Sequence, residues 1–196
     1  MKKFFRSIAR MRVVSLASLM LLGSGCANAP DSPEILLERA GILMDRGQEA
    51  EAVPFLDRAV SAMPENPEAY FQRGLAYERL DLHEKALDDY VACLKLDNLR
   101  ADALNNKAVQ LATLKRYDDA IAAFSELVNQ DQENFLGYRN RGLCRFDMQD
   151  FNGALTDYSA ALKLNPEDSS SWFQRGNVYL AANELEAAEN DYSKAL

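Results

Sequence analysis

The side chains that most often carry catalysis or hold metals are scarce in this sequence of 196 residues. It contains one histidine, His83, and three cysteines, Cys26, Cys93 and Cys144. A single histidine excludes multi-histidine metal sites, and the cysteines have neither metal-ligand spacing nor the density of a disulfide framework. The sequence also lacks a phosphate-binding glycine loop and a nucleophile elbow. We therefore expect no metal, no cofactor and no enzymatic activity.

Two pairs of neighbouring carboxylates, Asp88-Asp89 and Asp118-Asp119, are the remaining candidates for acid–base chemistry. Neighbouring residues on a helix point about 100° apart, so the two carboxylates of a pair cannot act on one substrate. We interpret both pairs as charges on helix surfaces. His83 is predicted to be a surface residue at the start of a helix.

The distribution of charge limits the class of partner. The net charge is −8, but residues 1–25 hold five of the 22 basic residues and none of the 30 acidic ones, which leaves −13 on the rest of the chain. A body this acidic repels phosphate backbones, so we do not expect a nucleic acid partner.

The N-terminal residues have the organisation of an export signal. A basic segment ending at Arg12 precedes an apolar stretch from Val13 to Leu22. The ten residues of this stretch rise only ~15 Å as a helix, about half of a bilayer core, which disfavours a permanent membrane span. Because the uncharged run continues to Pro30, an uncleaved anchor remains an alternative.

The segment from Leu22 to Cys26 resembles the lipobox of bacterial lipoproteins, although Gly23 stands where that family usually has leucine. The resemblance implies a signal peptide over residues 1–25, lipid on Cys26, a tether over residues 26–32, and a place in the bacterial envelope. In a diderm host that place would be the outer membrane, facing the periplasm. The alternative is ordinary cleavage after Ala29, which leaves Cys26 unmodified.

A period of 34 residues runs through the remainder of the chain. Alanine recurs at Ala52, Ala86, Ala120, Ala154 and Ala188, and four residues later come Leu56, Tyr90, Phe124, Tyr158 and Tyr192. In each half of the period, large or small packing residues recur at i, i+4 and i+7, which predicts two amphipathic helices. We expect an all-α chain of five helical hairpins over residues 33–66, 67–100, 101–134, 135–168 and 169–196, the last with an incomplete second helix. One hairpin cannot bury its apolar face alone, so the hairpins must stack.

This pattern resembles the tetratricopeptide repeat. Counted from the first residue of each hairpin, position 4 is large, position 8 is glycine or alanine (Ala40, Gly74, Ala108, Gly142, Gly176), and Pro64 and Pro166 fill position 32. The resemblance implies an α-solenoid, a right-handed superhelix with a concave groove that binds protein or peptide. Arg145 departs from the family's tyrosine at position 11, and Pro54 should kink the second helix of the first repeat or delay its start. Cys93 and Cys144 fall in packing positions of different repeats, so we predict that both are buried and not joined.

Position 7 is basic in every repeat, which admits two interpretations. A ladder of cations would bind an acidic ligand, whereas pairing with position 23 would join the two helices of a repeat. The second interpretation is favoured because aspartate occupies position 23 wherever position 7 is Arg73, Arg141 or Arg175. The predicted structural pairs are Arg73–Asp89, Arg141–Asp157 and Arg175–Asp191.

The concave groove is predicted from positions 5, 9 and 12 of each first helix and their neighbours. Ten of these fifteen positions are apolar, which favours a partner segment with apolar anchors. The predicted peptide-binding residues are Phe71, Leu75, Asn105, Asn106, Val109, Arg139, Asn140, Leu143, Phe146, Phe173 and Asn177. No repeat has the lysine–asparagine pair of the carboxylate clamp in chaperone-binding family members, so chaperone tails are not expected ligands.

The function predicted from these features is that of a lipid-anchored interaction module or scaffold that aids assembly of an envelope complex. The assembly role is implied by the resemblance alone. The alternative is a structural component that self-associates through the edge of its fifth repeat, where no capping helix follows Leu196 in the sequence given.

Overall fold

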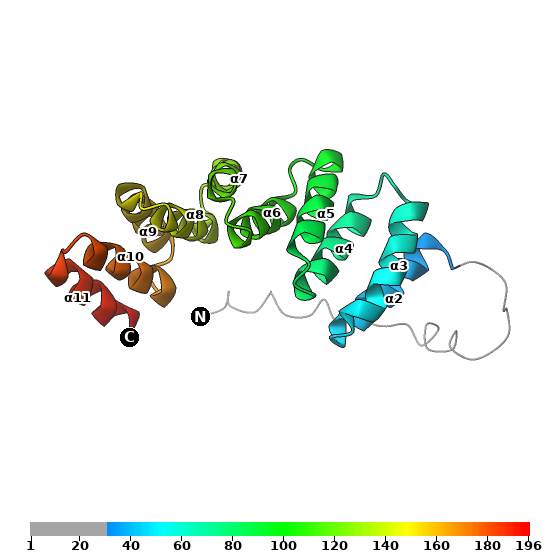
Figure 1. Ribbon diagram of the computed structural model, residues 1–196, viewed down its shortest axis with the longest axis horizontal. Coiled ribbons are helices and arrows are strands. Elements are labelled where there is room, and N and C mark those ends of the chain that lie inside the picture. Colours follow the sequence, from blue (N-terminus) through cyan, green and yellow to red (C-terminus); the bar gives the residue numbers. More distant parts are fainter. Residues whose placement is uncertain (1–30) are drawn as a thin grey trace, which may run out of the picture. The chain divides into compact units, whose positions relative to one another are not determined.

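The computed structural model describes residues 31–196, and within them it contains ten α-helices and no strand (Figure 1). The helices are α2 Pro33–Asp45, α3 Glu49–Ala62, α4 Pro67–Arg79, α5 His83–Leu96, α6 Ala101–Thr113, α7 Tyr117–Gln130, α8 Phe135–Asp147, α9 Phe151–Leu164, α10 Ser169–Ala181 and α11 Leu185–Ala195. The predicted all-α fold is confirmed. The predictions of a signal peptide and of lipid on Cys26 concern residues outside the described part.

The helices form a row of antiparallel hairpins in which each helix packs mainly against its neighbours along the chain (Figure 1). Each predicted segment contains one hairpin, with α2–α3 in the first and α10–α11 in the last. The helix that opens a hairpin also contacts the second helix of the preceding hairpin, as α6 contacts α5. Stacking therefore joins neighbours and leaves distant repeats apart, as expected for a repeat architecture.

Local sequence signals set the helix boundaries. The side chains of Ser32, Asn66, Asn134 and Asp168 cap four of the first helices by accepting a hydrogen bond from a backbone N–H in the first turn. The turn inside each hairpin needs one residue with positive φ, and this residue is Gly47, Asp81, Lys115, Gln149 or Asn183. Glycine adopts that conformation freely, whereas Lys115 and Gln149 adopt it at a cost in backbone energy.

Close helix approach in the core depends on small side chains. The five alanines that mark the period are buried at the interfaces between helices. A Cβ atom at Gly74 would lie 2.8 Å from the ring of Tyr90, and one at Gly176 would lie 2.7 Å from the ring of Tyr192. Position 8 is therefore glycine where position 24 is a tyrosine, because the ring occupies the space that a methyl group would need.

The predicted delay of α3 at Pro54 is wrong. The helix begins at Glu49, the same position at which the second helices of the other repeats begin, and it continues through the proline. Pro54 is exposed, and so is Ala50, whose carbonyl would otherwise accept the missing hydrogen bond. Water can satisfy that carbonyl, which lowers the cost of the proline.

Candidate functional site

All three predicted ion pairs form between the two helices of a repeat. Arg73 donates from Nε and Nη2 to the carboxylate of Asp89 at 2.8 and 2.7 Å. The Arg141–Asp157 pair has the same two-bond geometry at 3.0 and 2.7 Å, and Arg175–Asp191 has it at 2.7 and 3.0 Å. The hydrogen bonds to Asp89 raise the pKa of the Arg73 guanidinium above its ordinary value. These cations are already neutralised by partly or fully buried carboxylates, so they do not form a ladder for an acidic ligand.

Each of these arginines also reaches the preceding repeat, which the sequence analysis missed. The Nη1 atom of Arg73 donates to Asp57 at 2.9 Å. The Nη1 atoms of Arg141 and Arg175 donate to the hydroxyls of Ser125 and Ser159, both at 3.0 Å. All three acceptors lie at position 25 of the repeat before, so one guanidinium joins three helices.

The third repeat lacks this arrangement, and a hollow of about 450 Å³ lies between α5, α6 and α7. Its lining includes Val91, Lys107 and Ala123, which correspond to the acceptor, the arginine and the aspartate of the arrangements in the second, fourth and fifth repeats. The hollow is consistent with the absence of the guanidinium and of the large carboxylate. The sequence indicated the pairing of positions 7 and 23 because, in the third repeat, lysine at position 7 coincides with the loss of aspartate at position 23.

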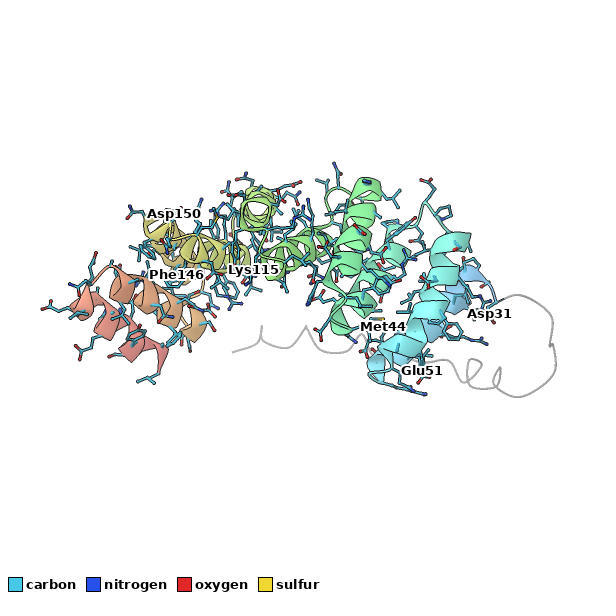
Figure 2. All side chains as sticks on the ribbon, viewed as in Figure 1. Asp31, Met44, Glu51, Lys115, Phe146 and Asp150 are labelled. Carbon is cyan, nitrogen blue, oxygen red and sulfur yellow. The ribbon has the colours of Figure 1, made fainter. Side chains whose placement is uncertain are left out.

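The predicted groove residues lie on the first helices, and their exposure differs along the chain. We call positions 5, 6, 9 and 12 of α2, α4, α6, α8 and α10 the inner face. Leu143 and Phe173 are exposed apolar residues of this face, whereas Leu75, Val109 and Phe146 are partly buried. Phe146, labelled in Figure 2, packs against the cluster of Ala154, Tyr158 and Val178 from α9 and α10. The exposed apolar surface of the inner face is therefore concentrated in α8 and α10.

Phe71 was predicted to be a groove residue, but it is buried, whereas a residue that anchors a peptide in a groove would be exposed. Its ring lies 5.9 Å from that of Tyr90, and the Arg100 guanidinium lies 3.8 Å from the centroid of the Phe71 ring. Arg100 is held there by hydrogen bonds to Glu68 and Asp102, both 2.8 Å long. The sequence analysis missed Arg100 because the residue lies between two helices and does not recur with the period.

Several predicted polar contacts are already used within the protein. Asn106 donates to the hydroxyl of Tyr90 at 3.4 Å, and Asn177 accepts from Tyr192 at 2.9 Å. The guanidinium of Arg139 is paired with Asp168 at 3.2 Å. Asn105 donates only to its neighbour Asn106, while the Asn140 side chain makes no hydrogen bond to another described residue. The structure thus assigns part of this set to holding the inner face in place.

The prediction that His83 and Asp89 lie on the surface is wrong. His83 is partly buried, and its Nδ1 atom lies 2.9 Å from Oε1 of the buried Gln110, so it links the second and third repeats. Asp89 is buried by its pairing with Arg73, while Asp88 beside it is exposed. Cys93 and Cys144 are both buried free thiols, as predicted.

Other types of site are not found in the described part of the chain. Residues 31–196 contain no group of three or more His, Cys, Asp or Glu side chains arranged to hold a metal ion. Among the same residues, no helix has the length and apolar character needed to cross a bilayer.

Comparison with known proteins identifies the repeat. A family model described as "Tetratricopeptide repeat" matches residues 67–98 and 169–196, and one described as "TPR repeat" matches residues 144–182. These segments coincide with the hairpins α4–α5 and α10–α11 and with the junction between the fourth and fifth repeats. The chain is a tetratricopeptide repeat protein. Members of this family act as protein-interaction scaffolds.

Curated tetratricopeptide repeat proteins match over limited parts of their own length. The chain is 32% identical over 100 residues to "Heat shock protein STI1" of Saccharomyces cerevisiae, covering 50% of this chain and 17% of that protein. It is 26% identical over 176 residues to human "Tetratricopeptide repeat protein 16", covering 80% of this chain and 20% of that protein. The chain thus spans about a fifth of the length of these relatives.

Solved structures with the same solenoid fold include bacterial proteins. The structure "MamA 41-end from Desulfovibrio magneticus RS-1" has a TM-score of 0.81 at 20% identity, covering 86% of this chain and 95% of that chain. YrrB, described as "a TPR protein with an unusual peptide-binding site", has a TM-score of 0.72 at 19% identity, covering 82% of each chain. PilF of Pseudomonas aeruginosa has a TM-score of 0.72 at 22% identity, covering 83% of this chain and 74% of that chain. At these identities the similarity establishes the fold alone.

Proposed function

We propose that this tetratricopeptide repeat protein binds a peptide segment of a protein partner on the inner face, centred on α8 and α10. The observation that supports this most directly is the exposure of Leu143 and Phe173 on the inner face. Exposed apolar side chains that are grouped on one surface are typical of interaction sites. Asn140, whose amide has no partner among the described residues, supplies a donor and an acceptor for a peptide backbone.

The solenoid favours binding because the inner face is held in place before a partner arrives. The arginine ties between repeats fix the first helices relative to the second helices behind them. A pre-ordered surface loses little conformational entropy on binding, so more of the contact energy appears as affinity. The net charge of −13 outside residues 1–25 favours segments that are neutral or basic over acidic ones.

We further propose that a lipid on Cys26 tethers this module to the bacterial envelope, where it aids assembly of a protein complex. The support is the lipobox-like sequence from Leu22 to Cys26 and the short distance in sequence from Cys26 to the start of α2 at Pro33. Several acyl chains would give stable anchoring, since one chain alone binds membranes only marginally.

Binding is tested by selecting peptides of a random library on the full chain and measuring their affinity by calorimetry. We expect Leu143→Asp and Phe173→Asp to weaken binding at least about tenfold, because each places a charge in an apolar contact. The matched control is Leu164→Asp, since Leu164 is similarly exposed but lies at the end of α9. Equal loss in the control, or no loss in the two variants, would reject the inner face as the binding site.

Anchoring is tested separately by metabolic labelling with palmitate in a bacterial host. The full chain should incorporate label and sediment with membranes, and Cys26→Ala should do neither. Label that persists in the Cys26→Ala variant would refute lipid attachment at this residue.

A further inference from the structure

We propose that the buried hydroxyl of Tyr158 donates a hydrogen bond to a backbone carbonyl of the bound peptide, at the base of the inner face. This inference rests on the proposed function and names the chemical group that the site recognises. It concerns a residue that does not belong to the predicted groove set.

Tyr158 differs from the two other tyrosines at the same repeat position. The hydroxyl of Tyr90 donates to Glu78 and accepts from Asn106. The hydroxyl of Tyr192 donates to Asn177 at 2.9 Å. The hydroxyl of Tyr158 is the one buried side-chain nitrogen or oxygen within residues 31–196 that has no hydrogen-bond partner. Such a group is an exception in folded proteins and calls for an explanation.

The repeat shows where this hydroxyl is directed. The ring of Tyr158 lies against Gly142, as the ring of Tyr90 lies against Gly74, so the two side chains occupy equivalent places. In the second and fifth repeats, the partners of the tyrosine hydroxyl lie at positions 12 and 9 of the first helix of the same repeat, and at position 6 of the first helix of the next repeat. The corresponding residues around Tyr158 are Phe146, Leu143 and Gln174, all of the inner face.

These replacements account for the missing partner. Leu143 and Phe146 have no hydrogen-bonding side-chain atom. Gln174, whose carbonyl oxygen accepts from Asn177 at 3.1 Å, makes no hydrogen bond to Tyr158. The hydroxyl is therefore directed toward the inner face but finds no acceptor there. Phe146 is partly buried and packs against the cluster that contains Tyr158, so we expect rotation of its ring to open a path to the hydroxyl.

The electrostatic surroundings select the kind of acceptor. Burial raises the pKa of Tyr158, and the charges of Asp147 and Asp157 raise it further, so the phenol stays protonated and acts as a donor. Arg139 has the opposite effect, but its charge is compensated by Asp168. The charge of Asp147 disfavours a carboxylate ligand, whereas the carbonyl of a peptide bond is neutral. Asp157 adds little to this effect, because Arg141 and Arg145 compensate its charge. Leu143, which is exposed on the inner face, would contact an apolar side chain of the same peptide.

The test uses peptides selected on the full chain from a random library, with affinity and thermal midpoint measured for each variant. We expect Tyr158→Phe to weaken binding about fivefold to tenfold, the effect of one lost hydrogen bond, without lowering the thermal midpoint. The matched control is Tyr90→Phe, which removes a hydroxyl with two partners in a distant repeat. It should lower the thermal midpoint and change the affinity less than about twofold.

A second measurement identifies the carbonyl itself. Replacing the peptide amides one at a time by esters weakens each carbonyl as an acceptor, and one position should lose affinity for the wild type but not for Tyr158→Phe. Peptides that bind equally to wild type and Tyr158→Phe, yet lose binding with Leu143→Asp, would overturn this inference and leave the proposed function intact. A library that yields no binder, or binders insensitive to Leu143→Asp, would overturn both.

Discussion

Arg141 and Asp157 face each other across the two helices of the fourth repeat, joined by hydrogen bonds of 3.0 and 2.7 Å. The Asp157 side chain is only 1% exposed, and it also accepts from Arg145 at 2.8 Å. Arg145 occupies the position at which the family usually has tyrosine. Arginine in place of tyrosine brings a second cation to the same carboxylate. One aspartate thus accepts hydrogen bonds from two arginines at the centre of the repeat.

We predict that Asp157→Ala destabilises the protein by about 3 kcal/mol, more than Arg141→Ala, because it removes the buried carboxylate that both Arg141 and Arg145 contact. The double variant should cost little more than Asp157→Ala alone. Denaturant unfolding of the two single variants and the double variant gives the coupling energy. Losses that add up independently would contradict the pairing.

The hollow in the third repeat should accept the missing pair. We expect Lys107→Arg combined with Ala123→Asp to be more stable than Ala123→Asp alone by about 1–3 kcal/mol, because an unpaired buried carboxylate is costly and a bidentate arginine relieves it. Thermal unfolding of the wild type, the two single variants and the double variant measures the effect. The control is Lys107→Arg alone, which should change stability little; a double variant no better than Ala123→Asp would show that the site cannot form the pair.

Arg100 covers Phe71 by contact between the guanidinium and the ring. We expect Arg100→Ala to cost about 1 kcal/mol or more, from the lost cation–π contact and the loss of the hydrogen bonds to Glu68 and Asp102. Arg100→Lys should recover only part of this loss, since an ammonium group cannot stack its plane on the ring while it bonds both carboxylates. Full recovery by lysine in urea unfolding would argue that charge alone matters at this position.

Burial raises the pKa of Cys144 from its ordinary value near 9 to about 11, and the charge of Asp147 adds to the effect. The folded state therefore holds this proton more tightly than the unfolded state does. Its contribution to stability is complete below pH 9 and is lost as the pH rises through 11, at up to about 1.4 kcal/mol per pH unit. Cys144→Ala should show a shallower decline in stability between these pH values, and an identical decline would refute this assignment.

The thiol should also resist alkylation in the folded protein. We expect iodoacetamide at pH 8 to modify Cys144 only after unfolding, because the thiolate is the reactive form and burial disfavours it. Mass spectrometry of labelled native and urea-unfolded protein distinguishes the two states. Rapid labelling of the native protein would indicate that α8 opens locally.

The repeat and the contacts within one hairpin could be predicted from the amino-acid sequence. The recurring alanines and large residues specify helix faces, and the helix caps and turn residues specify where helices begin and end, all through interactions over a few residues. Arg73 and Asp89 were predictable for the same reason: they are 16 residues apart within one hairpin, and the pair recurs in two other repeats. Recurrence at a fixed spacing makes such a pair recognisable in a single sequence.

Which inner-face residues remain open to a partner could not be predicted in this way, because it depends on how the repeats pack against one another. Arg100 closes over Phe71, Gln110 bonds His83, and Tyr158 is left without an acceptor because of the side chains that surround it. These contacts depend on one side chain of one repeat meeting a non-equivalent side chain of the same or the next repeat. They do not recur with the period, so no pattern in the sequence predicts them. Their geometry follows only from how neighbouring hairpins stack.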